Sequence, residues 1–101
     1  MNENLFVYGT LINQEIQKEA LGKTFEMVDD SLVGWKKSMV QIEGETYPIL
    51  EKSKNRFDII FGKVFEITEE DLKKIDKYET DEYRRIQVSL SSGEVAWVYV
   101  K

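Results

Sequence analysis

Short segments with the pattern of β-strands fill most of this sequence, and only two segments have the pattern of an α-helix. Strands dominate and the connections between them are short, so we expect an α+β domain. Its sheet should be small, mixed but mostly antiparallel, and either strongly curved or closed into a small barrel, with two short helices over its openings or one face. The expected strands are residues 5–8, 25–28, 32–36, 39–43, 47–51, 59–67, 85–90 and 95–100.

Turn residues separate these segments. Asp29-Asp30, Lys37-Ser38 and Gly44-Glu45 are predicted turns, and the polar residues 51–56 predict a long surface loop. Residues 59–67 are apolar at both alternating sets of positions, which predicts a strand buried on both faces. The last two strands should form an antiparallel hairpin around residues 91–94.

Both predicted helices have recognisable ends. Asn13 can cap a helix over residues 14–21, and Gly22 can end it. Thr68 can cap the second helix, whose first turn holds three acids where the helix dipole favours negative charge. We expect this second helix to run to about Glu79.

Cysteine and histidine are both absent from the 101 residues, a length that suits a single domain over residues 1–101. Their absence excludes a thiolate nucleophile, Ser-His and Cys-His pairs, and the commonest zinc ligands. The acidic pair at residues 29–30 lacks a full ligand set, so no metal site is predicted. An enzyme of this composition must therefore transfer protons mainly with Asp, Glu, Lys or Tyr.

The net charge of −5 repels phosphate backbones and anionic membranes, so we expect neither a nucleic acid nor a membrane as partner. The longest apolar runs are too short to span a bilayer, and the first residues do not have the pattern of a signal peptide. We therefore expect a cytoplasmic protein. The oligomeric state is left open.

The first candidate site is Tyr8-Gly9-Thr10-Leu11, at the end of the first expected strand. Glycine lets the backbone bend there, and successive N–H groups of such a turn can point at one anion. A ligand carboxylate would fit without any charged side chain. The alternative is an ordinary turn between a strand and a helix.

The second candidate is Glu79, at the end of the acidic helix. At about 100° per residue, Ile75 lies roughly 60° from Leu72, Asp76 about 40° and Glu79 about 20°, so Glu79 falls within the apolar stripe. Burial and a helix C-terminus both raise the pKa of a carboxyl, which would suit Glu79 for proton transfer near pH 7. The alternative is a glutamate in a frayed last turn that pairs with Lys or Arg.

Other residues could shape such a site. An arginine of the segment Tyr83-Arg84-Arg85 could pair with Glu79 or Asp81, or it could form an ordinary surface ion pair. Pro48, which follows Tyr47, fixes a local bend and could shape the rim of a site.

Six short segments, in this order along the chain, share the pattern of one known family: Leu5-Phe6-Val7-Tyr8-Gly9-Thr10-Leu11, Tyr47-Pro48-Ile49-Leu50, Gly62-Lys63-Val64-Phe65-Glu66-Ile67, Leu72-x-x-Ile75-Asp76-x-Tyr78-Glu79, Tyr83-x-Arg85-x-x-Val88 and Ala96-x-Val98-Tyr99-Val100. Together they resemble the gamma-glutamylcyclotransferase-like family, which includes the AIG2-like and gamma-glutamylamine cyclotransferase-like proteins. Members convert a γ-glutamyl group to 5-oxoproline and release the attached amine or amino acid.

The resemblance implies a small mixed barrel with its site at one mouth. It implies that Glu79 is the catalytic acid/base and that Tyr8 to Leu11 bind the substrate, a small γ-glutamyl molecule. No metal, cofactor or protein nucleophile would be required, because the α-amine of the substrate is the nucleophile. The substrate stays open between a γ-glutamylamine, a γ-glutamyl dipeptide and a biosynthetic intermediate with a γ-glutamyl protecting group. The alternative is a non-catalytic domain of the same fold that binds a small molecule or a protein.

Overall fold

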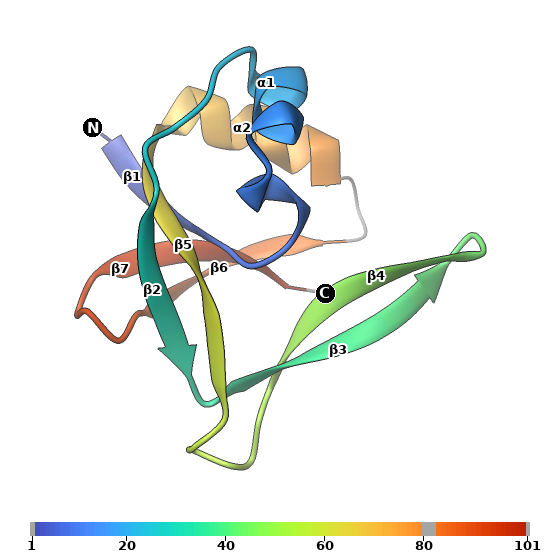
Figure 1. The fold of residues 1–101 in the computed structure, drawn as a ribbon, viewed down its shortest axis with the longest axis vertical. Helices are drawn as coiled ribbons and strands as arrows, with labels where there is room; N and C mark the ends of the chain where they lie inside the picture. The colour runs from blue at the N-terminus through green and yellow to red at the C-terminus, as the bar shows by residue number, and fades with distance from the viewer. Residues whose placement is uncertain (1, 80–82, 101) are drawn as a thin grey trace.

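A computed structural model of the chain describes residues 2–79 and 83–100, without the side chains of Thr10, Ile42, Tyr47, Pro48, Tyr78 and Glu79. Strands and two α-helices make up the described ranges, which confirms the α+β class (Figure 1). In chain order the elements are β1 (Asn2–Val7), the 3₁₀ turn η1 (Thr10–Ile12), α1 (Gln14–Leu21), β2 (Val28–Val33), β3 (Trp35–Ile42), β4 (Glu45–Lys52), β5 (Ile59–Thr68), α2 (Glu69–Glu79), β6 (Arg84–Ser89) and β7 (Val95–Val100).

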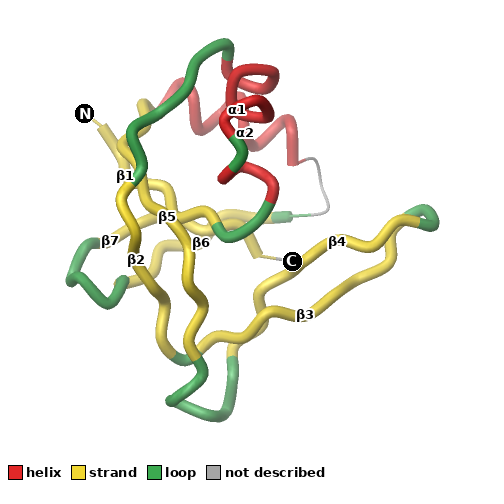
Figure 2. Tube along the Cα trace, in the orientation of Figure 1, coloured by secondary structure: helices red, strands yellow, loops and turns green. Residues whose placement is uncertain are grey.

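Five strands form one curved sheet in the order β2-β5-β1-β7-β6, and β3 pairs with β4 in a separate ribbon that projects from it (Figures 1 and 2). Within the described ranges β1 and β7 are parallel, whereas the other strand pairs are antiparallel. The mixed, mostly antiparallel curved sheet is therefore confirmed. The barrel alternative is wrong, because the ribbon leaves the sheet instead of closing it.

The ribbon leaves the sheet at Gly34, where a positive φ of 86° suits glycine. The N–H of Gly34 donates to the carbonyl oxygen of Asp58 at 2.8 Å, and its carbonyl accepts from the N–H of Ser53 at 2.9 Å. These bonds hold the base of the ribbon against the start of β5. The turn between β2 and β3 therefore lies at residue 34.

Two predicted turns are wrong, because Asp29-Asp30 lies inside β2 and Lys37-Ser38 inside β3. The segment 25–28 is also not a strand, except for its last residue. β2 is an edge strand, and the Asp30 carboxylate accepts hydrogen bonds from the Ser31 N–H and from the Ser92 hydroxyl. An acid that would favour a turn is thus accommodated within a strand, because the turn after β6 supplies its donor.

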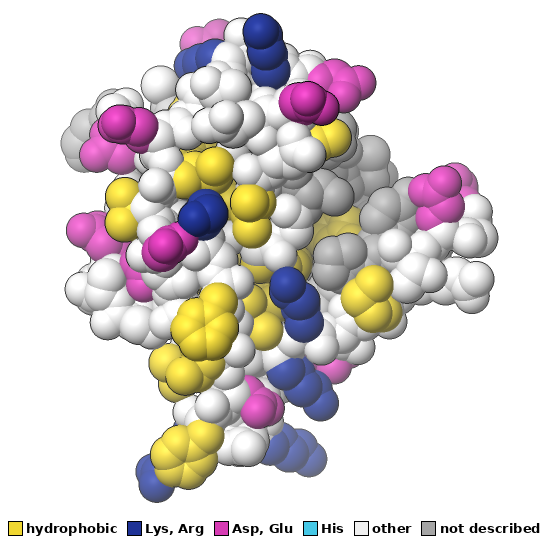
Figure 3. Space-filling view, viewed as in Figure 1, with side chains coloured by type: hydrophobic (Ala, Val, Ile, Leu, Met, Phe, Trp, Pro, Cys, Tyr) yellow, Lys and Arg dark blue, Asp and Glu magenta, His cyan; other side chains and the backbone are white. Residues whose placement is uncertain are grey.

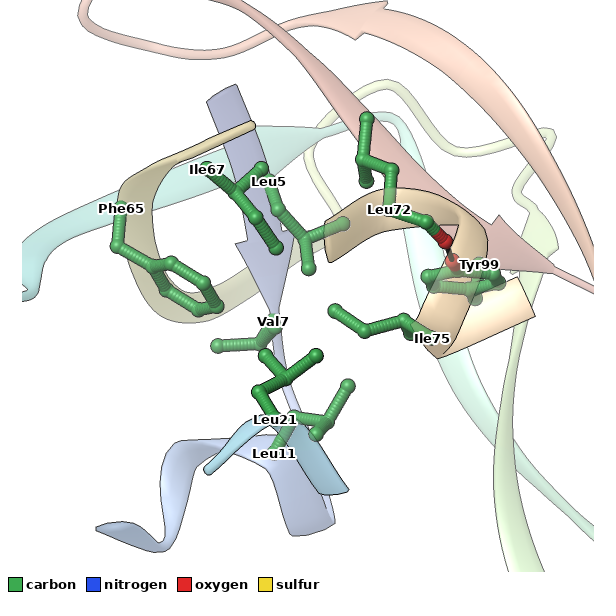
Figure 4. Packing of buried hydrophobic residues seen from close by; sticks show 9 residues of the cluster. All are labelled: Leu5, Val7, Leu11, Leu21, Phe65, Ile67, Leu72, Ile75 and Tyr99. Atoms are coloured by element: carbon green, nitrogen blue, oxygen red, sulfur yellow. Dashed lines mark hydrogen bonds between the residues drawn. The ribbon is translucent and has the colours of Figure 1, made fainter. Parts of the chain in front are cut away.

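β1 is the central strand, and its second half, from Leu5 to Val7, is buried on both faces. Leu5 and Val7 pack with Leu72 and Ile75 of α2 on the helix side (Figure 4). Phe6 points to the other face, where it belongs to a second cluster. The sheet therefore separates two hydrophobic cores, and α2 covers one of them.

β5 is buried on both faces only in part, so the prediction for this strand is half wrong. Phe65 is 3% exposed, but Phe61 on the same strand is 75% exposed. The helices lie over the half of the sheet that holds Phe65 (Figure 1), and hydrophobic side chains are visible over the other half of β2 and β5 (Figure 3). A continuous apolar pattern thus extends beyond the area that the helices cover.

Both helices begin with the caps that the sequence predicts. The Asn13 side chain accepts from the Glu15 N–H at 2.8 Å, and Gly22 ends α1 in a left-handed conformation. The Thr68 hydroxyl accepts from the Asp71 N–H at 3.1 Å. Lys23, just after α1, lies 2.6 Å from the Asp71 carboxylate and joins the two helices. Neither described helix has the length and apolarity needed to cross a membrane.

Candidate active site

The parallel pairing of β1 and β7 places the carboxyl ends of both strands at one edge of the sheet. Leu5 lies opposite Trp97 in this pair, so Tyr8 and Tyr99 follow in the same direction. The Tyr8 hydroxyl donates to the carbonyl oxygen of Tyr99 at 2.8 Å. This edge therefore holds the first candidate segment, Tyr8 to Leu11, directly beside the end of β7.

The helix α2 reaches the same edge through the side chain of Tyr99. The Tyr99 hydroxyl donates to the Asp76 carboxylate at 2.7 Å and lies 3.5 Å from the carbonyl oxygen of Leu72. Figure 4 shows the tyrosine against the helix, with its hydroxyl directed at Leu72. Tyr99 thus contacts both the strand that precedes the loop and the C-terminal half of α2.

The loop after β1 is tightly wound. The Ile12 N–H donates to the carbonyl oxygen of Gly9 at 3.1 Å and closes the 3₁₀ turn η1, while Leu11 is buried in the core beneath it. The first N–H groups of such a turn have no partner within the turn itself. The arrangement allows N–H groups of Gly9 to Leu11 to serve an external acceptor.

A fully buried glutamine on α1 supports this loop. The Gln17 amide nitrogen donates to the carbonyl oxygen of Leu11 at 2.7 Å, and its amide oxygen accepts from the Phe25 N–H at 3.2 Å. Sequence reasoning missed Gln17, because its position on α1 does not distinguish it from the exposed polar residues around it. The hydrogen bond to the Leu11 carbonyl group therefore holds the loop in place.

Asp76 and Arg85 form a two-point ion pair at the other side of the site. Arg85 Nε donates to Asp76 Oδ1 at 2.7 Å, and Nη2 donates to Oδ2 at 3.0 Å. The guanidinium also lies 4.5 Å from the centre of the Trp97 ring. An arginine held by a planar carboxylate and an aromatic face has a well-defined orientation.

The ion pair changes the proton affinity of both partners. Burial raises the pKa of Asp76, but hydrogen bonds from Arg85 and Tyr99 and the charge of Arg85 outweigh it and leave the pKa below its ordinary value. The hydrogen bond to Asp76 raises the pKa of Arg85, against a smaller effect of burial. Both groups are therefore charged at neutral pH.

The structure brings Tyr8, Leu11 and Arg85 to one edge, and Tyr83 is half-buried against the same core. Arg85 pairs with Asp76, a partner that the sequence prediction did not include. Glu79 ends α2, three residues after Asp76. The side chains of Glu79, Thr10, Tyr47 and Pro48 lie outside the described part, as does all of Asp81. Their predicted roles stay predictions.

Asp76 and Tyr99 were not predicted as site residues. Asp76 lies near the edge of the apolar stripe of α2 and within one of the six family segments, but its partner Arg85 lies on a strand beyond the helix. Among the described residues, no three acidic side chains converge to form a set that could hold a metal ion.

The model of one protein family, described as gamma-glutamyl cyclotransferase, AIG2-like, matches residues 5–101. The chain belongs to this family. The AIG2-like match covers both sides of the candidate site, and it confirms the resemblance expected from the six segments.

Curated AIG2-like relatives come from Arabidopsis thaliana. AIG2-like protein B is 32% identical over 88 residues, which cover 86% of this chain and 49% of that protein. AIG2-like protein A is 30% identical over 88 residues, which cover 86% of this chain and 51% of that protein. The chain thus spans about half the length of the curated relatives it matches.

Solved structures share the AIG2-like fold. A solution structure of an Arabidopsis thaliana protein has a TM-score of 0.81 and 26% identity, and the match covers 98% of this chain and 68% of that one. A structure described as a gamma-glutamyl cyclotransferase has a TM-score of 0.82 and covers 99% of this chain and 66% of that one. Its 16% identity makes it a likeness of fold alone.

Proposed function

We propose that this chain is a γ-glutamyl cyclotransferase-type enzyme that releases 5-oxoproline and an amine or amino acid from a γ-glutamyl substrate. One observation carries the proposal: Tyr99 contacts both Tyr8, at the start of the candidate binding loop, and Asp76, near the end of α2. Tyr99 therefore links the start of the predicted binding segment to the helix that carries the predicted acid/base, which supports a site between them.

The substrate supplies most of the chemistry. Its α-amine attacks its own γ-amide carbonyl, a C–N bond forms in a five-membered ring, and the bond from the γ-carbon to the leaving amine breaks. Holding the two groups in place supplies a large part of the rate enhancement, because ring closure of a correctly folded substrate is intramolecular. The protein then needs a grip on the α-carboxylate and one proton carrier.

The N–H groups of Gly9, Thr10 and Leu11 would bind the α-carboxylate, since an anion suits several backbone donors of one turn. Glu79 would take a proton from the α-ammonium group and return it to the departing nitrogen, and the second proton that the ring nitrogen loses would leave on the released amine as its ammonium. Tyr47, Pro48, Tyr83 and Arg85 would shape the rim of the site. The same carboxyl group is regenerated at the end of the cycle, so no net proton is lost from the enzyme.

The substrate class is a small γ-glutamyl compound. Candidates are a γ-glutamylamine, a γ-glutamyl dipeptide and a biosynthetic intermediate that carries a γ-glutamyl group. All share the α-amine, the α-carboxylate and the γ-amide that the mechanism requires. They differ only in the leaving group.

Release of 5-oxoproline from a panel of these compounds tests the proposal. Glu79→Gln should lower kcat by about 100-fold or more, the range typical of a lost general acid/base. Glu70→Gln is the matched control, because Glu70 lies on the exposed side of the first turn of the same helix.

Full activity of Glu79→Gln would show that Glu79 is not the proton carrier. If the wild-type protein forms no 5-oxoproline from any compound but still binds one of them, the non-catalytic binding domain is the better description.

A further inference from the structure

The last turn of α2 is bonded to β6 and β7 through Asp76, a carboxylate that the proposed reaction does not use. We propose that Asp76 is a positioning residue which, with Arg85 and Tyr99, fixes this turn and thereby Glu79 opposite the loop at Tyr8. The inference rests on the proposed function, since it assigns a purpose to the support of the proposed acid/base.

The end of a helix needs such support. The last four carbonyl groups of an α-helix have no partner within the helix, and the last turn tends to fray. Glu79 is the last residue of α2, and Asp76 lies three residues before it, in the same turn. A bond made by the Asp76 side chain therefore holds the turn that carries Glu79.

The bonds to Asp76 define an orientation as well as a distance. Two parallel hydrogen bonds from Arg85 and one from the Tyr99 hydroxyl converge on the carboxylate, at 2.7, 3.0 and 2.7 Å. Arg85 and Tyr99 lie opposite each other in the β6–β7 ladder, so both donors come from one rigid hairpin. The hairpin thus fixes the rotation of the helix end relative to the sheet.

The same hairpin holds the other half of the site. The carbonyl group of Tyr99 accepts the hydrogen bond from Tyr8, while its hydroxyl group donates to Asp76. Tyr99 therefore links the start of the binding loop to the end of the helix. The loop has a second support in Gln17, which bonds Leu11 and Phe25.

The partial exposure of the Asp76–Arg85 ion pair indicates that the pair contributes more to positioning the helix end than to the free energy of unfolding. The Asp76 side chain is 38% exposed and that of Arg85 is 22% exposed. A partly exposed ion pair contributes little to the free energy of unfolding, but its geometry can still hold a reacting group in place. Loss of the pair should therefore affect the catalytic step more than it affects folding.

Kinetics of three variants, on whichever γ-glutamyl compound the wild-type protein converts, test the inference. Asp76→Asn removes the ion pair, Arg85→Lys keeps the charge but loses the two-point geometry, and Tyr99→Phe removes only the hydroxyl group. Each should lower kcat by about 10- to 100-fold, as small misplacements of catalytic groups do. KM should stay within about threefold of wild type, because binding in the ground state uses the loop.

The matched control is Asp29→Asn. Asp29, on the edge strand β2, is largely exposed and forms an ion pair with Lys63, and its loss should leave kcat and KM unchanged. Hydrogen exchange adds a readout that does not need turnover: the amides of residues 77–79 should exchange several-fold faster in Asp76→Asn than in Asp29→Asn. The urea midpoint of each variant shows that it is folded, and Tyr99→Phe remains available if Asp76→Asn does not fold.

The outcomes separate the inference from the proposed function. A wild-type kcat for Asp76→Asn, with an inactive Glu79→Gln variant, overturns the inference and leaves the proposed function intact. A raised KM with unchanged kcat also overturns it, because Asp76 and Arg85 would then act in binding. A wild-type kcat for Arg85→Lys would show that the charge of residue 85 suffices and that the two-point geometry does not matter. This result would also overturn the inference. A wild-type protein that forms no 5-oxoproline overturns the proposed function and the inference with it.

Discussion

Gln17→Leu tests whether a buried amide holds the loop that follows β1. The side chain of Gln17 is fully buried, and it bonds the Leu11 carbonyl at 2.7 Å and the Phe25 N–H at 3.2 Å. Leucine has a similar size, so the main loss is that of these two hydrogen bonds and of a weaker one from the Gln17 amide nitrogen to the Met27 sulfur at 3.2 Å. The two backbone groups would lose their partner without gaining access to water.

The magnitude follows from these two groups. A buried polar group that loses its partner costs about 1–3 kcal/mol. Leu11 is buried and Phe25 is half-buried, so we expect a total loss of about 2–4 kcal/mol. Domains of this size have a free energy of unfolding of about 5–15 kcal/mol. A loss of 2 kcal/mol would lower Tm by about 8–16 °C.

Urea and thermal unfolding, followed by circular dichroism, measure the effect. Gln14→Leu is the matched control, because Gln14 lies on the same helix and is exposed, and its free energy of unfolding should change by less than about 0.5 kcal/mol. In the folded Gln17→Leu variant KM should rise more than kcat falls, since the binding loop loses its support. Equal unfolding midpoints for the two variants would refute the role of Gln17.

Three further predictions concern the sheet and the ion pair. A Cβ at Gly62 would lie 2.7 Å from Phe6 Cζ and collide with the Val7 carbonyl, so Gly62→Ala should cost about 1–3 kcal/mol in urea unfolding; an unchanged midpoint would contradict the close approach of β5 to β1. Phe61→Ala should change stability by less than about 0.5 kcal/mol and Phe65→Ala by about 3–5 kcal/mol, because only Phe65 is buried; similar losses would show that the outer half of β5 is covered. Burial raises the pKa of Asp76, but the bonds from Arg85 and Tyr99 hold it below 3.8, so its stabilising effect is complete above about pH 4 and is lost as the pH falls further. The free energy of unfolding should therefore fall less between pH 7 and pH 3 in Asp76→Asn than in the wild-type protein. An equal fall in both proteins, measured by urea unfolding at each pH, would show that Asp76 does not contribute to the pH dependence.

Features set by neighbouring residues could be predicted from the sequence. The caps at Asn13 and Thr68 depend on side chains within three residues of the helix start, and both formed as expected. The apolar stripe of α2 placed Leu72 and Ile75 in the core. The two candidate segments of the site were also predicted from local patterns, a turn and a helix face, and they stay predictions.

Features that depend on distant partners were missed. Asp30 suits a turn by itself, yet a hydroxyl 62 residues later bonds it within an edge strand. The exposure of Phe61 depends on how far the helices extend over the sheet. The pairing of Asp76 with Arg85 depends on the register of β6 with β7, and the burial of Gln17 depends on a loop that packs above it. A local sequence pattern cannot predict these contacts, because the partners lie far apart in the chain.

The position of β1 between β5 and β7 has a consequence for how the chain folds as it is synthesised. β1 is made before both of its neighbours, and one of them, β7, follows about ninety residues later. Until β7 emerges from the ribosome, this apolar strand has an open edge of unpaired N–H and C=O groups, which is a template for association with other chains. Pairing over such a separation is slow. We therefore expect newly made chains to need protection from aggregation until the last strand is in place.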